Sequence, residues 1–250
     1  MAVKWKIGDI KNNFVVAYYD LEFCNECETR RNFPIAIGVS YRRGGEEIAS
    51  YESLIWCGDE RKLWKEQLDR IGYDVNILRK HGKPMEEITE EILAANEEYQ
   101  PLMYVSFGRQ DSDLLKKHAT RSLEHFAFRD GIKFLSKRLS MKCEISLEKY
   151  SYICRLDFVH QFLPLADARC LADVIWRVLG GQIDENRRKE VAREYEGRLF
   201  LSQYKNKRQA YEYLSGLSEL TPRQKEKMHL QEEYLEKNRD RFLEYMKKQR

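Results

Sequence analysis

The sequence predicts a mixed α/β domain, a sheet flanked by helices, followed by a helical C-terminal appendage. Three observations lead to this fold class. Runs rich in β-branched and aromatic residues fill much of the first 55 residues, helical patterns separate them from another apolar run near residue 105, and aliphatic residues become scarce beyond Gln182. A chain of 250 residues has room for one such domain and an appendage. We therefore expect an α/β domain over residues 1–181 and a charged helical extension over residues 182–250.

The first elements are predicted to be three strands in a meander. Phe14–Phe23 is apolar, β-branched and aromatic, which is typical of a central strand. Pro34–Tyr41 predicts the second strand and Glu47–Ile55 the third. The segment Arg42–Gly45 ends in Gly-Gly and predicts the hairpin turn between them.

The following segments alternate between helical patterns and one more strand. Apolar residues at helical spacing predict most of the helices, and the run Pro101–Phe107 predicts the fourth strand. Met141–Phe158 is ambiguous and leaves a short strand open. The predicted helices are Asp59–Ile71, Asp74–Lys80, Met85–Glu98, a segment with Leu114 and Leu115, Arg129–Ser140, Leu165–Leu179, and two or three beyond Gln182, one of which starts at Thr221–Pro222.

Composition excludes several classes of protein. Six cysteines without regular spacing give no disulfide framework, and the first residues lack the apolar core of a signal peptide. No apolar run is long enough to span a bilayer. We expect a reduced, cytoplasmic protein without membrane association. Residues 182–250 contain 17 Lys or Arg and 13 Asp or Glu, so the extension is the more basic part of the chain.

Asp20 and Glu22 are the first candidates for chemistry. They lie two residues apart near the end of the first predicted strand, so their side chains leave the same face. Two carboxylates at one buried place repel each other and are costly to desolvate. A divalent cation such as Mg²⁺, which prefers oxygen ligands, resolves both problems. The alternative is that Asp20 and Glu22 merely begin a solvated loop.

Three ordered motifs resemble those of the DEDD exonuclease superfamily, which includes ribonuclease T, oligoribonuclease and polymerase proofreading subunits. The first is Asp20-Leu-Glu22 followed by Ile35–Gly38. The second is a strand leading through Gly108 to Asp111, with Asp113 as the competing acid. The third is Asp167-Ala168 at the head of an apolar helix, where a carboxylate that favours the helix dipole is the alternative explanation. The resemblance covers roughly residues 12–180.

The resemblance implies a ribonuclease H-like fold and a 3′–5′ exonuclease acting on single-stranded DNA or RNA. Asp20, Glu22, Asp111 and Asp167 would hold two Mg²⁺ or Mn²⁺ ions for two-metal hydrolysis of a phosphodiester. The loop after the first motif begins with Cys24, where the family contacts substrate. Phe23, Cys24 and Phe107 are therefore the candidate substrate-binding residues, and core packing is the alternative for the two rings.

The general base is where this chain departs from the family. The ribonuclease T branch carries a His five positions before the third-motif Asp, and this chain has Phe162 there. A second branch uses Tyr four positions before that Asp, where this chain has Leu163. His160 is the candidate base if the local backbone brings it inward, and a structural His is the alternative. A catalytically weak nucleic-acid-binding or partner-recruiting module is therefore the alternative function.

Two further patterns carry weaker signals. Cys24 and Cys27 have the spacing of one half of a zinc site, but no second pair follows at a fixed distance. Two basic clusters in the extension predict either phosphate contacts or a solvated surface. Its amphipathic, Tyr-rich helices predict packing on the core, a homodimer or a protein partner. The basic clusters are Arg187, Arg188 and Lys189, and Lys205, Lys207 and Arg208.

Overall fold

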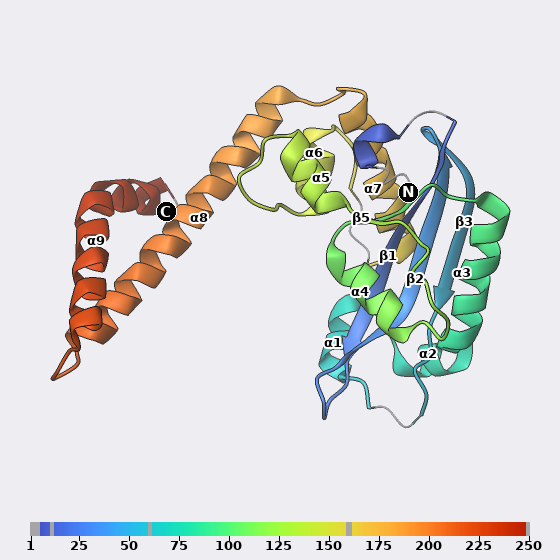
Figure 1. The fold of residues 1–250 in the computed structure, drawn as a ribbon, viewed down its shortest axis with the longest axis horizontal. Coiled ribbons are helices and arrows are strands. Elements are labelled where there is room, and N and C mark those ends of the chain that lie inside the picture. Colours follow the sequence, from blue (N-terminus) through green and yellow to red (C-terminus); the bar gives the residue numbers. More distant parts are fainter. Residues whose placement is uncertain (1–5, 11–12, 60–61, 159–161, 249–250) are drawn as a thin grey trace. The chain divides into compact units, whose positions relative to one another are not determined.

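Contacts divide the chain into two units, Met1–Arg188 and Lys189–Arg250, which are described separately (Figure 1). The sequence predicted that the helical extension begins after Gly181. The boundary between the two units lies a few residues later, within the helix that begins at Glu185. The structure is a computed structural model, and it describes residues 6–10, 13–59, 62–158 and 162–248.

The first unit is built on a mixed five-stranded sheet of order β3-β2-β1-β4-β5. Its central strand, β1, pairs antiparallel with β2 and parallel with β4. The prediction of a mixed sheet flanked by helices is confirmed. The strands are β1 (Val15–Asn25), β2 (Asn32–Arg43), β3 (Glu46–Leu54), β4 (Tyr104–Ser106) and β5 (Phe128–Asp130).

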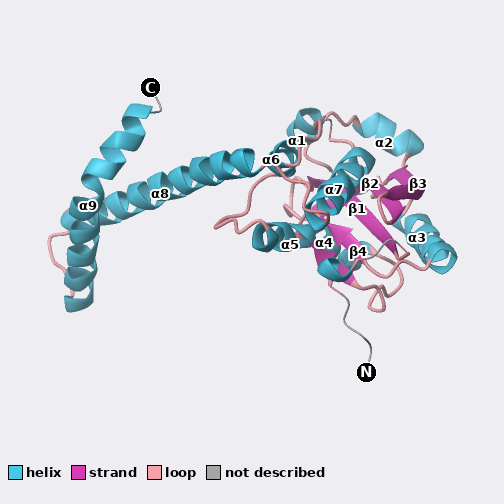
Figure 2. Ribbon diagram, turned by 90° about the horizontal axis from the view of Figure 1, so that it is seen from above, coloured by secondary structure: helices cyan, strands magenta, loops and turns pink. Residues whose placement is uncertain are grey.

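Helices cover both faces of this sheet (Figure 2). One face packs against α7, which contacts β1 and β2. The other forms an apolar core in which Tyr19, Leu21 and Ile37 of the sheet meet residues of α3 and α4. The helical elements of the first unit are η1 (Ile7–Asp9), α1 (Lys65–Ile71), α2 (Val75–His81), α3 (Met85–Tyr99), α4 (Arg109–His118), α5 (Gly131–Arg138), α6 (Leu147–Ile153) and α7 (Pro164–Leu179).

The predicted helix Asp59–Ile71 is shorter in the structure, because α1 begins only at Lys65. The backbone just before it pairs with the end of β1 instead. Leu63 forms an isolated antiparallel bridge with Glu26, and the Trp64 amide donates to the Asn25 carbonyl at 2.8 Å. This pairing between distant segments overrides the helical spacing of the local sequence.

Two other expectations need correction. The predicted helix Arg129–Ser140 begins with two residues of β5, and α5 starts only at Gly131. A strand of three residues, paired in parallel with β4, is too short to produce a recognisable alternation. The ambiguous stretch Met141–Phe158 contains no strand but a helix, α6, which Ser146 caps by accepting a hydrogen bond from the Lys149 amide.

The second unit is a helical hairpin formed by α8 (Glu185–Ser215) and α9 (Pro222–Lys248). Thr221 and Gln224 cap the start of α9 reciprocally, as the Thr-Pro signal predicts. Between the helices, Tyr204 stacks on Phe242 with 4.1 Å between ring centroids. None of the helices in the described part of the chain is long and apolar enough to cross a membrane.

Candidate active site

Three of the predicted acids lie together on one face of the sheet. Asp20 and Glu22 project from β1, and Asp167 projects from the first turn of α7. One carboxylate oxygen from each of the three lies within 4.8 Å of the other two, and they form the one such group of potential metal ligands among the described residues. Opposite oxygens around a Mg²⁺ ion are about 4.2 Å apart, because each lies about 2.1 Å from the ion. The three oxygens therefore fit around one small cation after little movement.

Gly38 brings α7 close enough for this arrangement. It lies directly opposite Asp20 in the β1–β2 ladder. A Cβ atom at Gly38 would be only 2.0 Å from the backbone nitrogen of Leu165 and 2.4 Å from its Cα. The backbone of α7 thus rests on the backbone of β2 two residues before Asp167, and only glycine permits this contact.

Asp111 and Asp113, the two candidates for the second motif, have different surroundings. Asp111 lies in the first turn of α4 with 9% of its surface exposed. Its charge acts on Asp20, and the charge of Glu22 acts on Asp111. Asp113, in contrast, forms an ion pair with Arg109 at 3.3 Å, with more than half of its side chain exposed. Asp111 of α4 therefore lies within electrostatic range of the acids on β1, and it stays the preferred fourth acid of the predicted set.

Burial and mutual repulsion dominate the electrostatics of these acids. Burial raises the pKa of Asp20 well above its ordinary value, and the charges of Asp111, Asp167 and Glu22 raise it further. Burial followed by the charge of Asp167 raises the pKa of Glu22 to about 7. Burial followed by the charge of Glu22 raises the pKa of Asp111 to about 7. Hard oxygen donors that repel one another fit divalent cations, since such ions neutralise the charge and accept these ligands.

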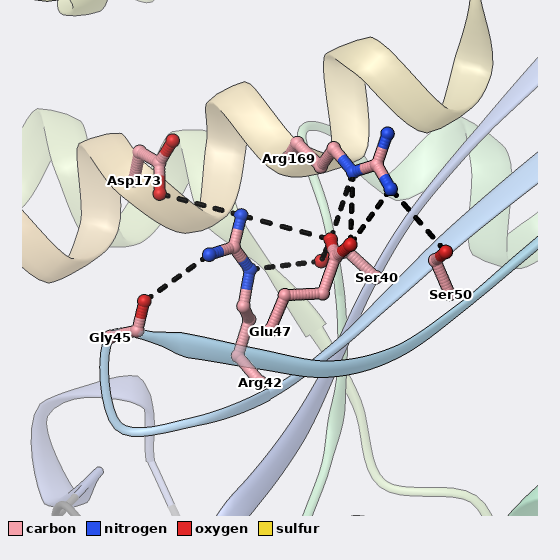
Figure 3. A network of polar contacts seen from close by, with 7 residues as sticks. All are labelled: Ser40, Arg42, Gly45, Glu47, Ser50, Arg169 and Asp173. Atoms are coloured by element: carbon pink, nitrogen blue, oxygen red, sulfur yellow. Dashed lines mark hydrogen bonds and ion pairs between the residues drawn. The ribbon is translucent and has the colours of Figure 1, made fainter.

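A polar network fixes α7 to the β2–β3 hairpin (Figure 3). Arg169, two residues after Asp167, binds Glu47 of β3 through two nitrogens at 2.7 and 2.9 Å. Arg42 of β2 reaches Asp173 of α7 at 3.5 Å and Glu47 at 3.8 Å. These contacts hold the start of α7, and with it Asp167, over the sheet whose strand β1 carries Asp20 and Glu22.

A pocket of about 270 Å³ opens beside the acids. The sequence motifs identify only Asp20, Phe107 and Asp167 of its lining. Ser146, Leu147 and Glu148 lie in the stretch whose pattern is ambiguous, so no signal pointed to them. The lining residues are Asp20, Phe107, Ser146, Leu147, Glu148, Phe158 and Asp167. A larger cavity of about 530 Å³ lies between η1 and α5 and contains none of the four acids.

The three candidate substrate-binding residues differ in their surroundings and in their exposure to solvent. Phe107 lines the pocket beside the acids. Phe23 is half-buried and packs against the apolar core, so a contact with substrate stays a prediction for this ring. Cys24 has no exposed surface, and burial raises the pKa of its thiol to about 11. A side chain without exposed surface does not reach a strand bound from solvent, so we exclude Cys24 from the proposed contacts.

Phe162 occupies the position at which the resemblance implies a general base. The candidate base His160 lies outside the described residues. Phe162 has a φ of 50°, in the left-handed region that a bulky residue rarely adopts. Its side chain packs against the cluster that contains Cys24 and Leu68, and its carbonyl accepts a hydrogen bond from the Tyr73 hydroxyl at 3.0 Å. No motif of the sequence points to Tyr73.

Comparisons with known proteins give a consistent result for the fold. The nuclease domain of 3′hExo, a DEDDh family member bound to rAMP, is similar with a TM-score of 0.57 at 12% identity, over 69% of this chain and 97% of that one. Cell-death related nuclease 4 (CRN-4) has a TM-score of 0.53 at 12% identity, over 69% of this chain and 66% of that one. Exonuclease I from Methylocaldum szegediense has a TM-score of 0.51 at 14% identity, over 82% of this chain and 46% of that one. No protein-family model and no curated protein matches the sequence.

The chain therefore has a ribonuclease H-like α/β fold similar to that of these nucleases, as the resemblance implied. At 12–14% identity the likeness concerns the fold. Any statement about the chemistry of this chain therefore has to rest on its own acid cluster.

Proposed function

We propose that this chain is a metal-dependent 3′–5′ exonuclease that hydrolyses phosphodiester bonds of single-stranded DNA or RNA. The cluster of Asp20, Glu22 and Asp167 from β1 and α7, together with the charge of Asp111 acting on Asp20, is the observation that carries the proposal. Repelling carboxylates in a partly buried cluster are costly for the fold, and a bound divalent cation would offset this cost. The 3′ polarity rests on likeness to a 3′-exonuclease that recognises the 3′ end of a histone mRNA stem-loop.

Each part of the site has a role in this proposal. The four acids hold two Mg²⁺ or Mn²⁺ ions, which when bound would lower the pKa of a water and stabilise the leaving 3′ oxygen. The pocket beside Asp20 and Asp167 receives the terminal nucleotide, and Phe107 offers an aromatic surface on which its base stacks. The network of Arg169 and Glu47 keeps Asp167 in register with Asp20.

A cleavage assay on 5′-labelled single strands tests the proposal. With Mg²⁺ or Mn²⁺, a 3′–5′ exonuclease gives a ladder of shortened labelled strands, and a circular strand stays intact. We expect Asp111→Asn to abolish cleavage and Asp113→Asn to leave it unchanged, because only Asp111 belongs to the cluster. Equal activity of these two variants would contradict the assignment. Parallel DNA and RNA strands of the same sequence decide the substrate.

The second candidate function is a catalytically weak module that binds nucleic acid or recruits a partner. Phe162 favours it, since its side chain offers no proton acceptor where the family has its base. In this case wild type and Asp111→Asn would both bind a single strand and leave it intact. Filter binding beside the cleavage assay separates the two functions.

A second part of the proposal concerns the helical hairpin and the partners that it contacts. We propose residues 1–181 as the nuclease domain and residues 182–250 as an appendage that contacts a protein partner or a second copy of the chain. The exposed Tyr213 and Leu230 supply apolar contact surface, since 69% and 57% of their areas are accessible. Light scattering of the full chain distinguishes a monomer from a dimer. We also propose a cytoplasmic location, because the six cysteines lack the regular spacing of a disulfide framework.

A further inference from the structure

The cavity between η1 and α5 is separate from the site described above. It shares no lining residue with the pocket beside the acids. Its volume is about 530 Å³, about twice the 270 Å³ of that pocket. Sites that hold small molecules typically measure about 300–1,000 Å³. The cavity is therefore large enough for a ligand of the size of a nucleotide.

Four basic side chains from three segments of the chain line this cavity. Lys137 and Arg138 come from the last turn of α5, where the helix dipole favours cations, so the helix alone would explain this pair. Lys6, just before η1, and Arg129 of β5 lie outside this helix, so its dipole does not explain why they line the same cavity. Four like charges around one hollow repel one another, and a bound anion relieves this repulsion.

The two acidic side chains of the lining do not neutralise these charges. Asp9 accepts a hydrogen bond from the Lys6 backbone amide at 2.8 Å. Asp130 accepts one from the Lys133 amide at 3.0 Å and also pairs with the Lys133 ammonium at 3.5 Å. Both acids are thus engaged at the starts of η1 and α5, while three of the four basic side chains are exposed and form no ion pair with any described residue. These three are Lys6, Lys137 and Arg138.

The cavity also has an apolar wall. Ile7 of η1 is buried, and Phe134 of α5 is half-buried. At Gly8, η1 has no side chain that would cover the ring of Phe134, since a Cβ there would lie 4.0 Å from Cε2 of this ring. A simple anion would leave this wall unfilled. A ligand with both a phosphate and a flat ring fits the whole lining, because Lys and Arg bind phosphate and aromatic side chains stack on bases.

We propose that this cavity binds a nucleoside monophosphate, either as a free molecule or as one unit of a bound strand. Lys6, Lys137 and Arg138 bind the phosphate, and Phe134 stacks on the base. The site needs no metal ion and lies apart from the acids, so it goes beyond the proposed cleavage and does not depend on it.

Calorimetric titration of the full chain with AMP, in EDTA and at low salt, tests the proposal. EDTA removes divalent ions, so AMP does not bind at the acids through a metal. Lys137→Gln and Arg138→Gln each remove one charge from an exposed side chain. Each should raise the Kd for AMP about tenfold, which is typical of losing a hydrogen bond to a charged group. Neither should change Tm.

Lys117→Gln is the matched control. It removes the same charge from an exposed position in the last turn of α4, which does not line the cavity, and should leave the Kd unchanged. An equal rise in Kd for Lys117→Gln, Lys137→Gln and Arg138→Gln would overturn the proposal, since AMP would then respond to the overall charge of the protein.

Phe134→Leu tests the contact with the base, because it keeps an apolar side chain and removes the aromatic face. The variant should bind AMP several-fold more weakly. Ribose 5-phosphate, which has no base, should bind wild type and Phe134→Leu equally. Unchanged affinity for AMP, or an equal loss for both ligands, overturns the assignment of a nucleotide.

Competition separates the two sources of the nucleotide. Filter binding follows a labelled single strand on wild type and on Arg138→Gln, with increasing AMP and in EDTA. A strand that AMP displaces from wild type, and that Arg138→Gln binds more weakly, identifies a unit of a bound strand. A strand that neither AMP nor the substitution affects, beside calorimetric binding of AMP, identifies a free nucleotide. Absence of AMP binding to wild type overturns the proposal, and it leaves the proposed cleavage untouched because no metal is present in these measurements.

Discussion

Gly38→Ala places a methyl group where the structure leaves no space for one. The new Cβ would be 2.0 Å from the Leu165 nitrogen, whereas ordinary contacts begin at 3.4 Å, so the two backbones must separate by about 1.4 Å. β2 is paired on both sides, with Asp20 and Glu52 opposite Gly38, so it resists movement. The start of α7 therefore moves, and Asp167 moves away from Asp20.

The magnitude of the effect follows from this displacement. Overpacking of this kind costs about 1–3 kcal/mol of unfolding free energy, so the variant should still fold. Catalysis is more sensitive, because a misplacement of about 1 Å costs on the order of 100-fold in rate. We expect Gly38→Ala to lose about 100-fold in kcat and to bind Mn²⁺ more weakly.

Calorimetric titration with Mn²⁺ and the cleavage assay measure these two effects. Gly180→Ala, at the other end of α7, is the matched control. A Cβ there meets its nearest atom at 3.5 Å, and the φ of −77° suits alanine. Wild-type metal affinity and rate in Gly38→Ala would refute the reasoning, since they would show that the spacing of Asp20 and Asp167 does not depend on this contact.

Three further predictions concern charge. Asp20→Asn should raise the Tm of the metal-free protein by relieving repulsion, and should remove the Tm increase that Mg²⁺ gives wild type in differential scanning fluorimetry. The folded-state pKa values of Glu22 and Asp111, both about 7, lie above their unfolded values of 4.5 and 3.8. The native state therefore binds more protons than the unfolded state between about pH 4 and pH 7, so urea unfolding of metal-free protein should show stability that falls as pH rises through this window. A free energy of unfolding that rises with pH in this window would contradict the prediction. Glu47→Gln should cost about 1 kcal/mol in urea unfolding and weaken Mn²⁺ binding several-fold, whereas Glu212→Gln, in the exposed pair with Arg208, should change neither.

The sequence predicted the parts of the fold whose signals are local. The strand that carries Asp20 and Glu22 has a strong β-branched and aromatic pattern, and the helix after Asp167 has a clear apolar stripe. Asp111 followed from the order of motifs rather than from its surroundings. For the strand and the helix, the informative residues lie within about ten positions of one another, which is the range that periodicity describes.

The remaining features depend on contacts between distant segments. β5 has only three residues and exists because β4 offers it an edge for pairing. Arg169 and Glu47 are 122 positions apart, and Tyr73 and Phe162 are 89 apart. Residue type alone does not connect such pairs, since an arginine on a helix and a tyrosine in a loop have many equally suitable partners.

Helix α7 is seated on the β2–β3 hairpin at two places. Its first turn rests on Gly38, and the indole of Trp176 near its other end lies over Gly45 in the hairpin turn. Contacts at both ends of the helix oppose a tilt or slide away from the sheet while the hairpin keeps its shape. If the proposed activity is correct, ions and cleaved nucleotides would then enter and leave through the pocket beside Phe107, with the helix in place. The rate of product release should then depend on that opening and not on domain closure.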